Sequence, residues 1–514
     1  LRRRRGPDRT RLNGGGGARP LHCGKRIDID PDQGGAIPER AGSLPMDPMP
    51  SLAAPAFDAE LIARHDLNGP RYTSYPTAPH FDVLFGQAEY RAAAAASNEE
   101  PIPRPLSLYI HLPFCPSPCF YCGCNRVITR TRSEIGAYLV RLEREIALQS
   151  ALFDRDRQVL QLHLGGGTPN YLDLDQMAAL MDALRSGFTF GPESQREFSI
   201  EIDPRLSGAG TMAGLARLGF NRASFGVQDF DPAVQQAINR IQGVDETMGV
   251  IADARAAGFR SVSVDLIYGL PLQTLEGFAR TLEIVIAGRP DRIAVYGYAH
   301  LPEVFKAQRQ IDPADMPPAS TRLALLGLAI DTLRQAGYQY LGMDHFALPQ
   351  DELAQAQSAG DLQRNFQGYS THAECDLVGL GVSAIGKVGD CYAANARDLT
   401  GYYAAIDAGH LAVMRGHRLT EDDTLRGTII QALMCSGDLD MQAFGERHGF
   451  DFGQRFAAEL NRLEPLVADG LVRIEAGHLR VTPRGRLLVR LVAMAFDAYL
   501  ARPGEKAPRY SRVI

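Results

Sequence analysis

From Leu106 onward, the chain alternates between short apolar runs and longer segments whose apolar residues recur at helical spacing. The short runs are rich in Val, Ile and aromatic residues, which is typical of strands. Two of the longer segments begin at Ser133 and Ser320, and each serine is expected to cap the helix that follows it. The predicted strands are Leu106–Leu112, Val159–Leu164, Glu197–Ile202, Arg222–Val227, Ser261–Ile267, Arg292–Tyr298 and Tyr340–Met343.

This alternation of strands and helices predicts an α/β fold with a parallel sheet and crossover helices. A closed or partial (β/α) barrel is favoured over a doubly wound sheet, although the alternation alone does not decide between them. In a barrel, functional side chains gather where strands end and the following loops begin. The ends of the predicted strands are therefore the places to look for a site.

Several of these strand ends carry glycine or polar residues. One strand ends in the run Gly165–Pro169, and others end near Glu201, Gln228, Asp265 and Ala299. Taken singly, a glycine run is an ordinary turn and a carboxylate is an ordinary helix cap. Taken together on one rim, they indicate a functional site.

The pattern divides the chain into four parts. Residues 1–57 begin with an arginine block and a glycine run, and are expected to be a disordered arm or a translated upstream sequence with the natural start at Met46 or Met49. From about residue 419, helices and a hairpin predict a mainly helical, winged-helix-like unit. The predicted parts are an N-terminal extension (1–57), a segment near the active site (58–105), the barrel (106–350) and a C-terminal domain (351–514).

Composition and charge narrow the class of protein. The net charge of -6 argues against a nucleic-acid-binding protein, because such proteins carry a basic excess. No apolar run approaches the ~20 residues that a membrane span needs. No signal peptide is recognisable after the early arginines. The expected location is the cytoplasm, where thiols stay reduced.

Four of the eight cysteines lie within ten positions, directly after the first predicted strand. A zinc site would need a second closely spaced pair, and none follows in the sequence. A redox dithiol at Cys119 and Cys122 would leave Cys115 unexplained. These three cysteines have the spacing C-x3-C-x2-C, which suits three ligands of an iron–sulfur cubane whose fourth iron stays open.

The cysteine spacing, with Tyr121 directly before Cys122, resembles the signature of radical S-adenosylmethionine (SAM) enzymes. Over roughly residues 58–514 the chain is similar to the oxygen-independent coproporphyrinogen III oxidase (dehydrogenase) family. The motifs that carry this resemblance are "GPRYTSYPTA", "CGCN", "HLGGGTP", "NRASFGVQDF", "DLIYGLPLQT", "YAHLP", "GMDHFA", "NFQGYST" and "SRVI".

The resemblance implies that Cys115, Cys119 and Cys122 ligate one [4Fe-4S] cluster, and that its open iron binds a first SAM. The implied contacts of this SAM are Tyr109, Gly166, Glu201 and Ile385. A second SAM is also implied, with contacts at Tyr121, Gly167, Thr168, Gln228, Arg240, Asp265 and Ala299. Cys124 is not expected to be a ligand. It is either a buried thiol that shapes the loop or a catalytic contact near the second SAM.

The implied reaction is the oxidative decarboxylation of two propionates of coproporphyrinogen III to vinyl groups, which gives protoporphyrinogen IX for heme biosynthesis. Two SAM molecules are cleaved to methionine and 5′-deoxyadenosine, with electrons from a low-potential donor such as flavodoxin or ferredoxin. The protein is expected to be a monomer. Candidate propionate contacts are Arg71, Tyr72, His345, Arg364, Asn365 and Gln367.

Two other interpretations remain open from the sequence. One is a heme chaperone of the same family that does not decarboxylate. Cys124, the "GPRYTSYPTA" segment and the long C-terminal unit argue against it. The other is a radical SAM enzyme that acts on a different tetrapyrrole.

Overall fold

The computed structural model describes residues 54–372, 374–500 and 510–512. The proposed starts at Met46 and Met49, and all of residues 1–53, lie outside them. The described residues belong to one compact unit, Pro48–Ile514. None of the helices described is long and apolar enough to cross a membrane.

Six parallel strands form the centre of a mixed sheet, as the sequence predicted. They pair in chain order from β1 to β9. Their buried positions are filled by Val, Ile, Leu and Phe, because helices cover one face of the sheet and the inner side chains pack on the other. These strands are β1 (Leu106–Leu112), β4 (Gln158–Gly166), β6 (Glu197–Ile202), β7 (Arg222–Gln228), β8 (Ser261–Tyr268) and β9 (Arg292–Gly297).

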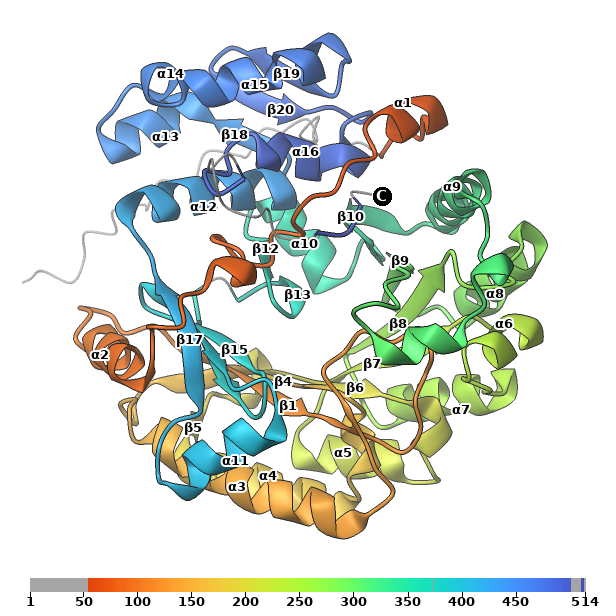
Figure 1. Ribbon diagram of the computed structural model, residues 1–514, viewed down its shortest axis with the longest axis vertical. Helices are drawn as coiled ribbons and strands as arrows, with labels where there is room; N and C mark the ends of the chain where they lie inside the picture. The colour runs from red at the N-terminus through yellow and green to blue at the C-terminus, as the bar shows by residue number, and fades with distance from the viewer. Residues whose placement is uncertain (1–53, 373, 501–509, 513–514) are drawn as a thin grey trace, which may run out of the picture. The chain divides into compact units, whose positions relative to one another are not determined.

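Figure 1 shows the crossover helices along the outer side of these strands. The predicted serine caps are wrong, because the N-cap positions of α3 and α9 are Thr131 and Pro318, two residues earlier in each case. The helices are α3 (Arg132–Ser150), α4 (Leu174–Gly187), α5 (Thr211–Leu218), α6 (Pro232–Ala237), α7 (Val244–Ala256), α8 (Leu275–Ala287) and α9 (Ala319–Gln335).

The parallel run ends on both sides without closing, so among the described residues the barrel is partial. The last predicted strand does not continue it: β10 (Gln339–Gly342) pairs antiparallel with β11 (His345–Ala347), which pairs antiparallel with β9. The chain turns back here because Gly342 and Met343 have positive φ angles of 148° and 52°. A hairpin therefore stands where another parallel strand was expected.

On the other side, β14 (Asp376–Leu380) pairs parallel with β1 and begins an antiparallel meander. The meander continues through β15 (Ile385–Val388), β16 (Cys391–Asn395) and β17 (Val413–Arg418). Between the two regions lie α10 (Glu352–Ala359) and the hairpin of β12 (Gln363–Asn365) and β13 (Gly368–Ser370), and α11 (Leu399–Asp407) joins β16 to β17.

The C-terminal unit has the helix–strand–helix–hairpin order of a winged-helix fold. Its sheet has the order β18-β20-β19, so the first strand pairs with the last. The elements are α12 (Glu421–Cys435), β18 (Asp438–Asp440), α13 (Met441–His448), α14 (Phe452–Arg455), α15 (Ala457–Ala468), β19 (Val472–Glu475), β20 (His478–Val481) and α16 (Val489–Met494).

The N-terminal segment contacts both larger regions. Its helix α2 (Gln87–Asn98) packs against β15, β16 and β17, and α1 (Ala59–Arg64) contributes Leu61 to the core of the C-terminal unit. The Tyr72 hydroxyl donates to Asp497 at 2.9 Å in a buried position. Residues far apart in sequence are thereby held together around the open side of the barrel.

Candidate active site

The four clustered cysteines lie on the loop between β1 and the short strand β3 (Val127–Ile128). Cys115 belongs to β2 (Phe114–Cys115), which pairs parallel with β3 and closes the base of the loop. The backbone N–H of Phe120 donates to the Ile238 carbonyl at 2.9 Å, and the amide of Asn239 donates to the Pro118 carbonyl at 2.7 Å. The loop is thus fixed at its base and at its tip.

The glycine-rich end of β4 packs directly beneath this loop. The N–H of Gly167 donates to the Leu112 carbonyl at 2.8 Å. A Cβ on Gly167 would lie 2.5 Å from the Pro113 carbonyl carbon, so no larger residue fits there. Gly166 has a φ of 114°, which only glycine adopts readily. The glycine run therefore serves to bring β4 and the cysteine loop into contact.

Arginine side chains surround the cysteines. Arg240 donates to the Sγ of Cys119 at 3.6 Å, to Asp203 at 3.1 Å and to the Gly226 carbonyl at 2.6 Å. Arg205 lies 3.9 Å from the same sulfur and also pairs with Asp203. Burial opposes the charge on Arg240, but nearby anionic groups outweigh that effect and raise its pKa further. A permanent positive charge therefore faces Cys119.

The thiols differ in how readily they ionise. The hydrogen bond from Cys124, together with the nearby arginines, lowers the pKa of Cys122 to about 6, and the pKa of Cys124 is raised in turn. Burial raises the pKa of Cys115 to about 11, although Thr168 donates to its Sγ at 3.2 Å. Cys124 is exposed, so the alternative in which it is a buried thiol is wrong.

Two carboxylates face the cysteines from neighbouring strands. Glu201 accepts from the Gly166 N–H at 3.1 Å and from His163 Nε2 at 3.3 Å. Burial raises the pKa of Glu201, but the His163 and Gly166 contacts outweigh it, so the net shift is downward. Burial and the charge of Glu201 raise the pKa of Asp265 to about 7. One carboxyl is therefore held ionised beside another that titrates near neutrality.

These groups meet in one cavity of about 310 Å³ at the carboxyl ends of the barrel strands. Twelve of the residues singled out from the sequence line it. They are Cys115, Cys119, Tyr121, Cys122, Cys124, Gly166, Gly167, Thr168, Glu201, Gln228, Arg240 and Asp265.

Three other predicted SAM contacts lie outside the lining of this cavity. Tyr109 stacks on His163 with ring centroids 5.9 Å apart, so it is one side chain removed from Glu201. Ala299 is linked to the loop because Gln308 donates to both its carbonyl and that of Tyr121, at 3.2 and 2.9 Å. Ile385 lies on β15, separated from β1 by β14.

The sequence reasoning missed several residues that hold this site. His111 hydrogen-bonds the Tyr109 hydroxyl at 3.0 Å and the Asn125 carbonyl at 2.9 Å, which joins the two ends of the cysteine loop. Asp203 and Arg205 follow Glu201 in the chain. Asp203 accepts from both Arg205 and Arg240, the two arginines that face Cys119. Their position, two and four residues after the strand-end carboxylate Glu201, is the feature of the sequence that could have indicated them.

The candidate propionate contacts divide into two groups. In the first group, the Tyr72 hydroxyl donates to Asp497, Arg71 pairs with Asp344, and Asn365 accepts from the Gln367 N–H at 2.9 Å. Arg364 is buried, and its Nη1 has no hydrogen-bond partner among the described residues; the same holds for His345 Nδ1 and Gln367 Nε2. The second group therefore retains free hydrogen-bonding capacity.

The family comparisons agree with this geometry. Residues 109–285 match the radical SAM superfamily, and residues 419–488 match the HemN C-terminal domain. The chain is 48% identical over 458 residues to the oxygen-independent coproporphyrinogen III oxidase of Pseudomonas aeruginosa, which covers 89% of this chain and 99% of the relative. The Escherichia coli protein of the same name is 46% identical, with 89% of this chain and 98% of the relative covered.

A solved structure gives the same assignment. The coproporphyrinogen III oxidase (HemN) from Escherichia coli, described as a radical SAM enzyme, superposes with a TM-score of 0.82 at 46% identity. The match covers 87% of this chain and 100% of that one. Because close relatives match over nearly their whole length, and the three-cysteine loop faces a strand-end cavity, the chain belongs to the oxygen-independent coproporphyrinogen III oxidase family of radical SAM enzymes.

Proposed function

We propose that this protein decarboxylates two propionate side chains of coproporphyrinogen III to vinyl groups, which gives protoporphyrinogen IX. Each propionate loses CO2, one hydrogen atom to the 5′-deoxyadenosyl group of SAM, and one electron to an acceptor. The observation that supports this most strongly is the similarity, over 89% of this chain, to enzymes named for this substrate, together with the shared cavity of cysteines and carboxylates. The reaction uses two SAM molecules per product.

The residues present suit a [4Fe-4S] cluster. Cys115, Cys119 and Cys122 are free thiols on one loop, and all three line the cavity. Thiolates are the ligands that such clusters take, and three of them leave one iron open. When bound, the cluster supplies the low-potential electron that SAM cleavage requires, delivered by a donor such as flavodoxin or ferredoxin. The guanidinium of Arg240 offsets the negative charge that the ligands carry.

The carboxylates suit the cationic groups of SAM. Ionised Glu201 can accept from the ammonium or ribose hydroxyls of the SAM at the open iron, near Gly166, Tyr109 and Ile385. Asp265 belongs to the second SAM, whose other contacts are drawn from both sides of the cavity. These contacts are Tyr121, Gly167, Thr168, Gln228, Arg240 and Ala299.

A buried positive region leads away from this cavity and suits the substrate's carboxylates. Tyr296 lines the cavity. The ring of His345 packs edge-on against the Tyr296 ring, with centroids 5.9 Å apart, and the Tyr369 ring packs edge-on against His345, with centroids 5.3 Å apart. Arg364 lies over the Tyr369 ring at 5.0 Å. Burial, together with the charges of Arg364 and Arg71, lowers the pKa of His345 to about 3. We assign the unpartnered Nη1 of Arg364 to a substrate propionate.

The protein is proposed to act as a monomer in the cytoplasm. Cys124 lies at the cavity wall, hydrogen-bonded to the proposed ligand Cys122, and is not itself proposed as a ligand.

The cluster assignment predicts a difference among the four cysteines. Changing Cys115, Cys119 or Cys122 to Ser should strip the iron, because a three-thiolate site cannot hold the cubane with one ligand removed. Cys124→Ser should retain about four irons per chain, measured by iron and sulfide analysis after anaerobic reconstitution. Equal iron loss in Cys124→Ser and Cys115→Ser would show that the ligand set is wrong.

The reaction itself is tested by product analysis. Reconstituted, reduced protein is incubated anaerobically with coproporphyrinogen III, SAM, a low-potential donor and an electron acceptor. We expect protoporphyrinogen IX with two 5′-deoxyadenosines per product, and Glu201→Ala should abolish both. A heme chaperone would bind heme and form no product, and an enzyme for another tetrapyrrole would cleave SAM without decarboxylation. Either result excludes the proposed function.

The raised pKa of Asp265 predicts that SAM binding depends on pH. Its pKa is raised to about 7, so the carboxyl is neutral below that pH and anionic above it. Since SAM carries sulfonium and ammonium cations, affinity at the second site should rise between pH 6 and 8, measured by equilibrium dialysis of cluster-loaded protein. Asp265→Asn should flatten this rise, whereas Glu201→Gln should weaken the first site and move the rise to lower pH, because the charge of Glu201 contributes to the raised pKa of Asp265. An unchanged pH profile in Asp265→Asn contradicts the assignment.

Arg364→Gln tests the propionate contact. Loss of a charge-assisted hydrogen bond costs about 1.5–3 kcal/mol, so KM for coproporphyrinogen III should rise ~10-fold or more. Iron content and SAM binding should not change. The control is Arg418→Gln, which removes an exposed arginine paired with Asp390. If the two variants have the same KM, Arg364 does not bind the substrate.

A further inference from the structure

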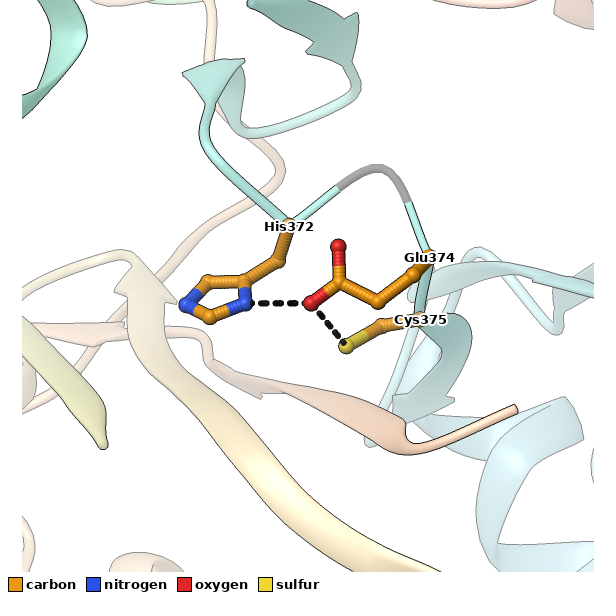
Figure 2. A group of neighbouring side chains, drawn as sticks. All are labelled: His372, Glu374 and Cys375. Atoms are coloured by element: carbon orange, nitrogen blue, oxygen red, sulfur yellow. Dashed lines mark hydrogen bonds and ion pairs between the residues drawn. The ribbon is translucent and has the colours of Figure 1, made fainter. Parts of the chain in front are cut away.

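A second cluster of metal-ligand side chains lies far from the cysteine loop along the barrel strands. His372, Glu374 and Cys375 stand on the loop between β13 and β14, and Figure 2 shows their functional groups turned toward one another. His372 Nδ1 lies 2.8 Å from Glu374 Oε1, and the Sγ of Cys375 lies 3.9 Å from the same oxygen. The three atoms all lie within 4.8 Å of one another. Ligands of a tetrahedral zinc ion are separated by about 3.2–3.8 Å, so only small movements are needed.

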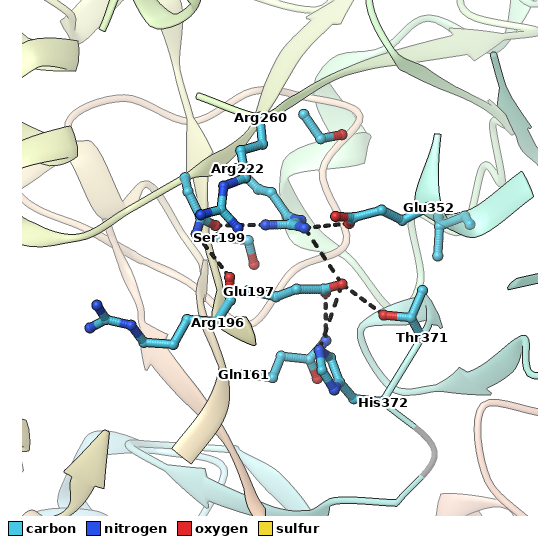
Figure 3. A network of polar contacts seen from close by, with 12 residues as sticks. Gln161, Arg196, Glu197, Ser199, Arg222, Arg260, Glu352, Thr371 and His372 are labelled. Carbon is cyan, nitrogen blue, oxygen red and sulfur yellow. Dashed lines mark hydrogen bonds and ion pairs between the residues drawn. The ribbon is translucent and has the colours of Figure 1, made fainter. Parts of the chain in front are cut away.

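The other nitrogen of the imidazole meets a carboxylate. His372 Nε2 lies 3.7 Å from Glu197 Oε1. Figure 3 shows that Glu197 is itself held in place: it accepts from Thr371 at 2.7 Å and from Gln161 at 3.3 Å, and pairs with Arg222 at 3.7 Å. Metal-binding histidines characteristically direct their second nitrogen to a carboxylate, and at 3.7 Å Glu197 lies in that position as an ion-pair contact longer than a hydrogen bond. Here this arrangement turns Nδ1 toward Glu374 and Cys375.

The position of this cluster separates it from the catalytic cavity. Cys375 directly precedes Asp376, the first residue of β14, and Glu197 and Arg222 are the first residues of β6 and β7. The group therefore lies at the amino ends of the parallel strands, whereas the cysteine loop lies at their carboxyl ends. His372 and Cys375 also line a cavity of about 480 Å³, which gives a small ligand access.

The charges around the thiol favour a cation. The charged groups that act on Cys375 are the carboxylates of Glu374, Asp376 and Glu197. Asp376 and Glu197 are paired with Arg157 and Arg222, but Glu374 has no arginine or lysine partner among the described residues. A thiolate, an imidazole and a carboxylate together match the ligand preference of zinc.

We propose that His372, Glu374 and Cys375 bind one zinc ion. Nδ1 of His372, a carboxylate oxygen of Glu374 and the Sγ of Cys375 are the protein ligands, and water from the 480 Å³ cavity takes the fourth position. The thiol gives up its proton to solvent when the metal binds. The bound ion joins the loop before β14, through His372 and Glu197, to the amino ends of β6 and β7. Its role is to stabilise the amino ends of the barrel strands.

The test measures zinc and iron in the same sample. Anaerobically reconstituted protein is equilibrated with buffered micromolar zinc, gel-filtered and analysed by mass spectrometry of the elements. Wild-type protein should hold one zinc beyond its iron, because the cluster cysteines are already occupied. Cys375→Ser and His372→Gln should each lose that zinc and keep their iron. Zinc should raise the melting temperature of the wild type and leave that of both variants unchanged.

Two further variants keep the proposal falsifiable. Cys435→Ser removes a different thiol, which is buried, lines the same cavity and lies 3.5 Å from Gln431, so this variant should retain the zinc. Glu197→Gln leaves all three ligands in place and should weaken zinc affinity 10- to 100-fold, as loss of such a carboxylate does. This variant decides the outcome if the ligand variants do not fold. Absence of stoichiometric zinc in the wild type, retention of zinc in both ligand variants, or unchanged affinity in Glu197→Gln overturns the proposal.

Discussion

The contact between the buried guanidinium of Arg240 and the Sγ of Cys119 is the interaction on which the active site depends. Thiolates gathered on one loop repel one another, and burial in a protein makes each charge more costly. Arg240 supplies a fixed positive charge and joins three pieces of chain, because it contacts the cysteine loop, Asp203 after β6 and the Gly226 carbonyl on β7. A Cβ on Gly226 would lie 3.0 Å from Nη2 of Arg240, so the glycine makes room for this contact.

The two rims of the partial barrel carry different kinds of side chain. At the carboxyl ends, positive φ angles at Gly166 and Gln228 and the close approach of β4 to the cysteine loop place reactive groups around one cavity. At the amino ends, charged side chains pair with one another: Arg222 with Glu197, and Arg292 with Asp351 at 2.9 Å. This agrees with the general division in such barrels between a catalytic face and a stabilising face.

The sequence predicted most of this arrangement because its signals were local. Strand β1 matched its apolar run residue for residue, and the cysteine spacing predicted a loop whose cysteines line the cavity at the strand ends. The predicted serine caps were wrong because sequence preferences locate a helix start only to within one or two residues. Ser133, for example, lies two residues after the N-cap of α3. The chain reversal after β10 depends on the positive φ angle of Met343. A methionine in the sequence does not indicate such an angle.

The contacts that hold the site were harder to predict. His111 hydrogen-bonds Tyr109 and also Asn125, which lies fourteen positions further along the chain, and Arg240 reaches a sulfur 121 positions away. Such pairings arise from the tertiary fold, and no periodicity or motif in a single sequence encodes them. The same is true of His372 and Glu197, which lie on different elements and meet only when β6 and the loop before β14 come together.

The central claim is that the charge of Arg240 stabilises the thiolate-bound cluster, and the reduction potential of that cluster in Arg240→Met measures it most directly. Methionine keeps much of the side-chain volume and removes the positive charge. Because reduction adds an electron, loss of a nearby cation should make the potential more negative than that of the wild type, measured without SAM by electron paramagnetic resonance at controlled potentials. An unchanged potential at full iron occupancy would contradict the claim.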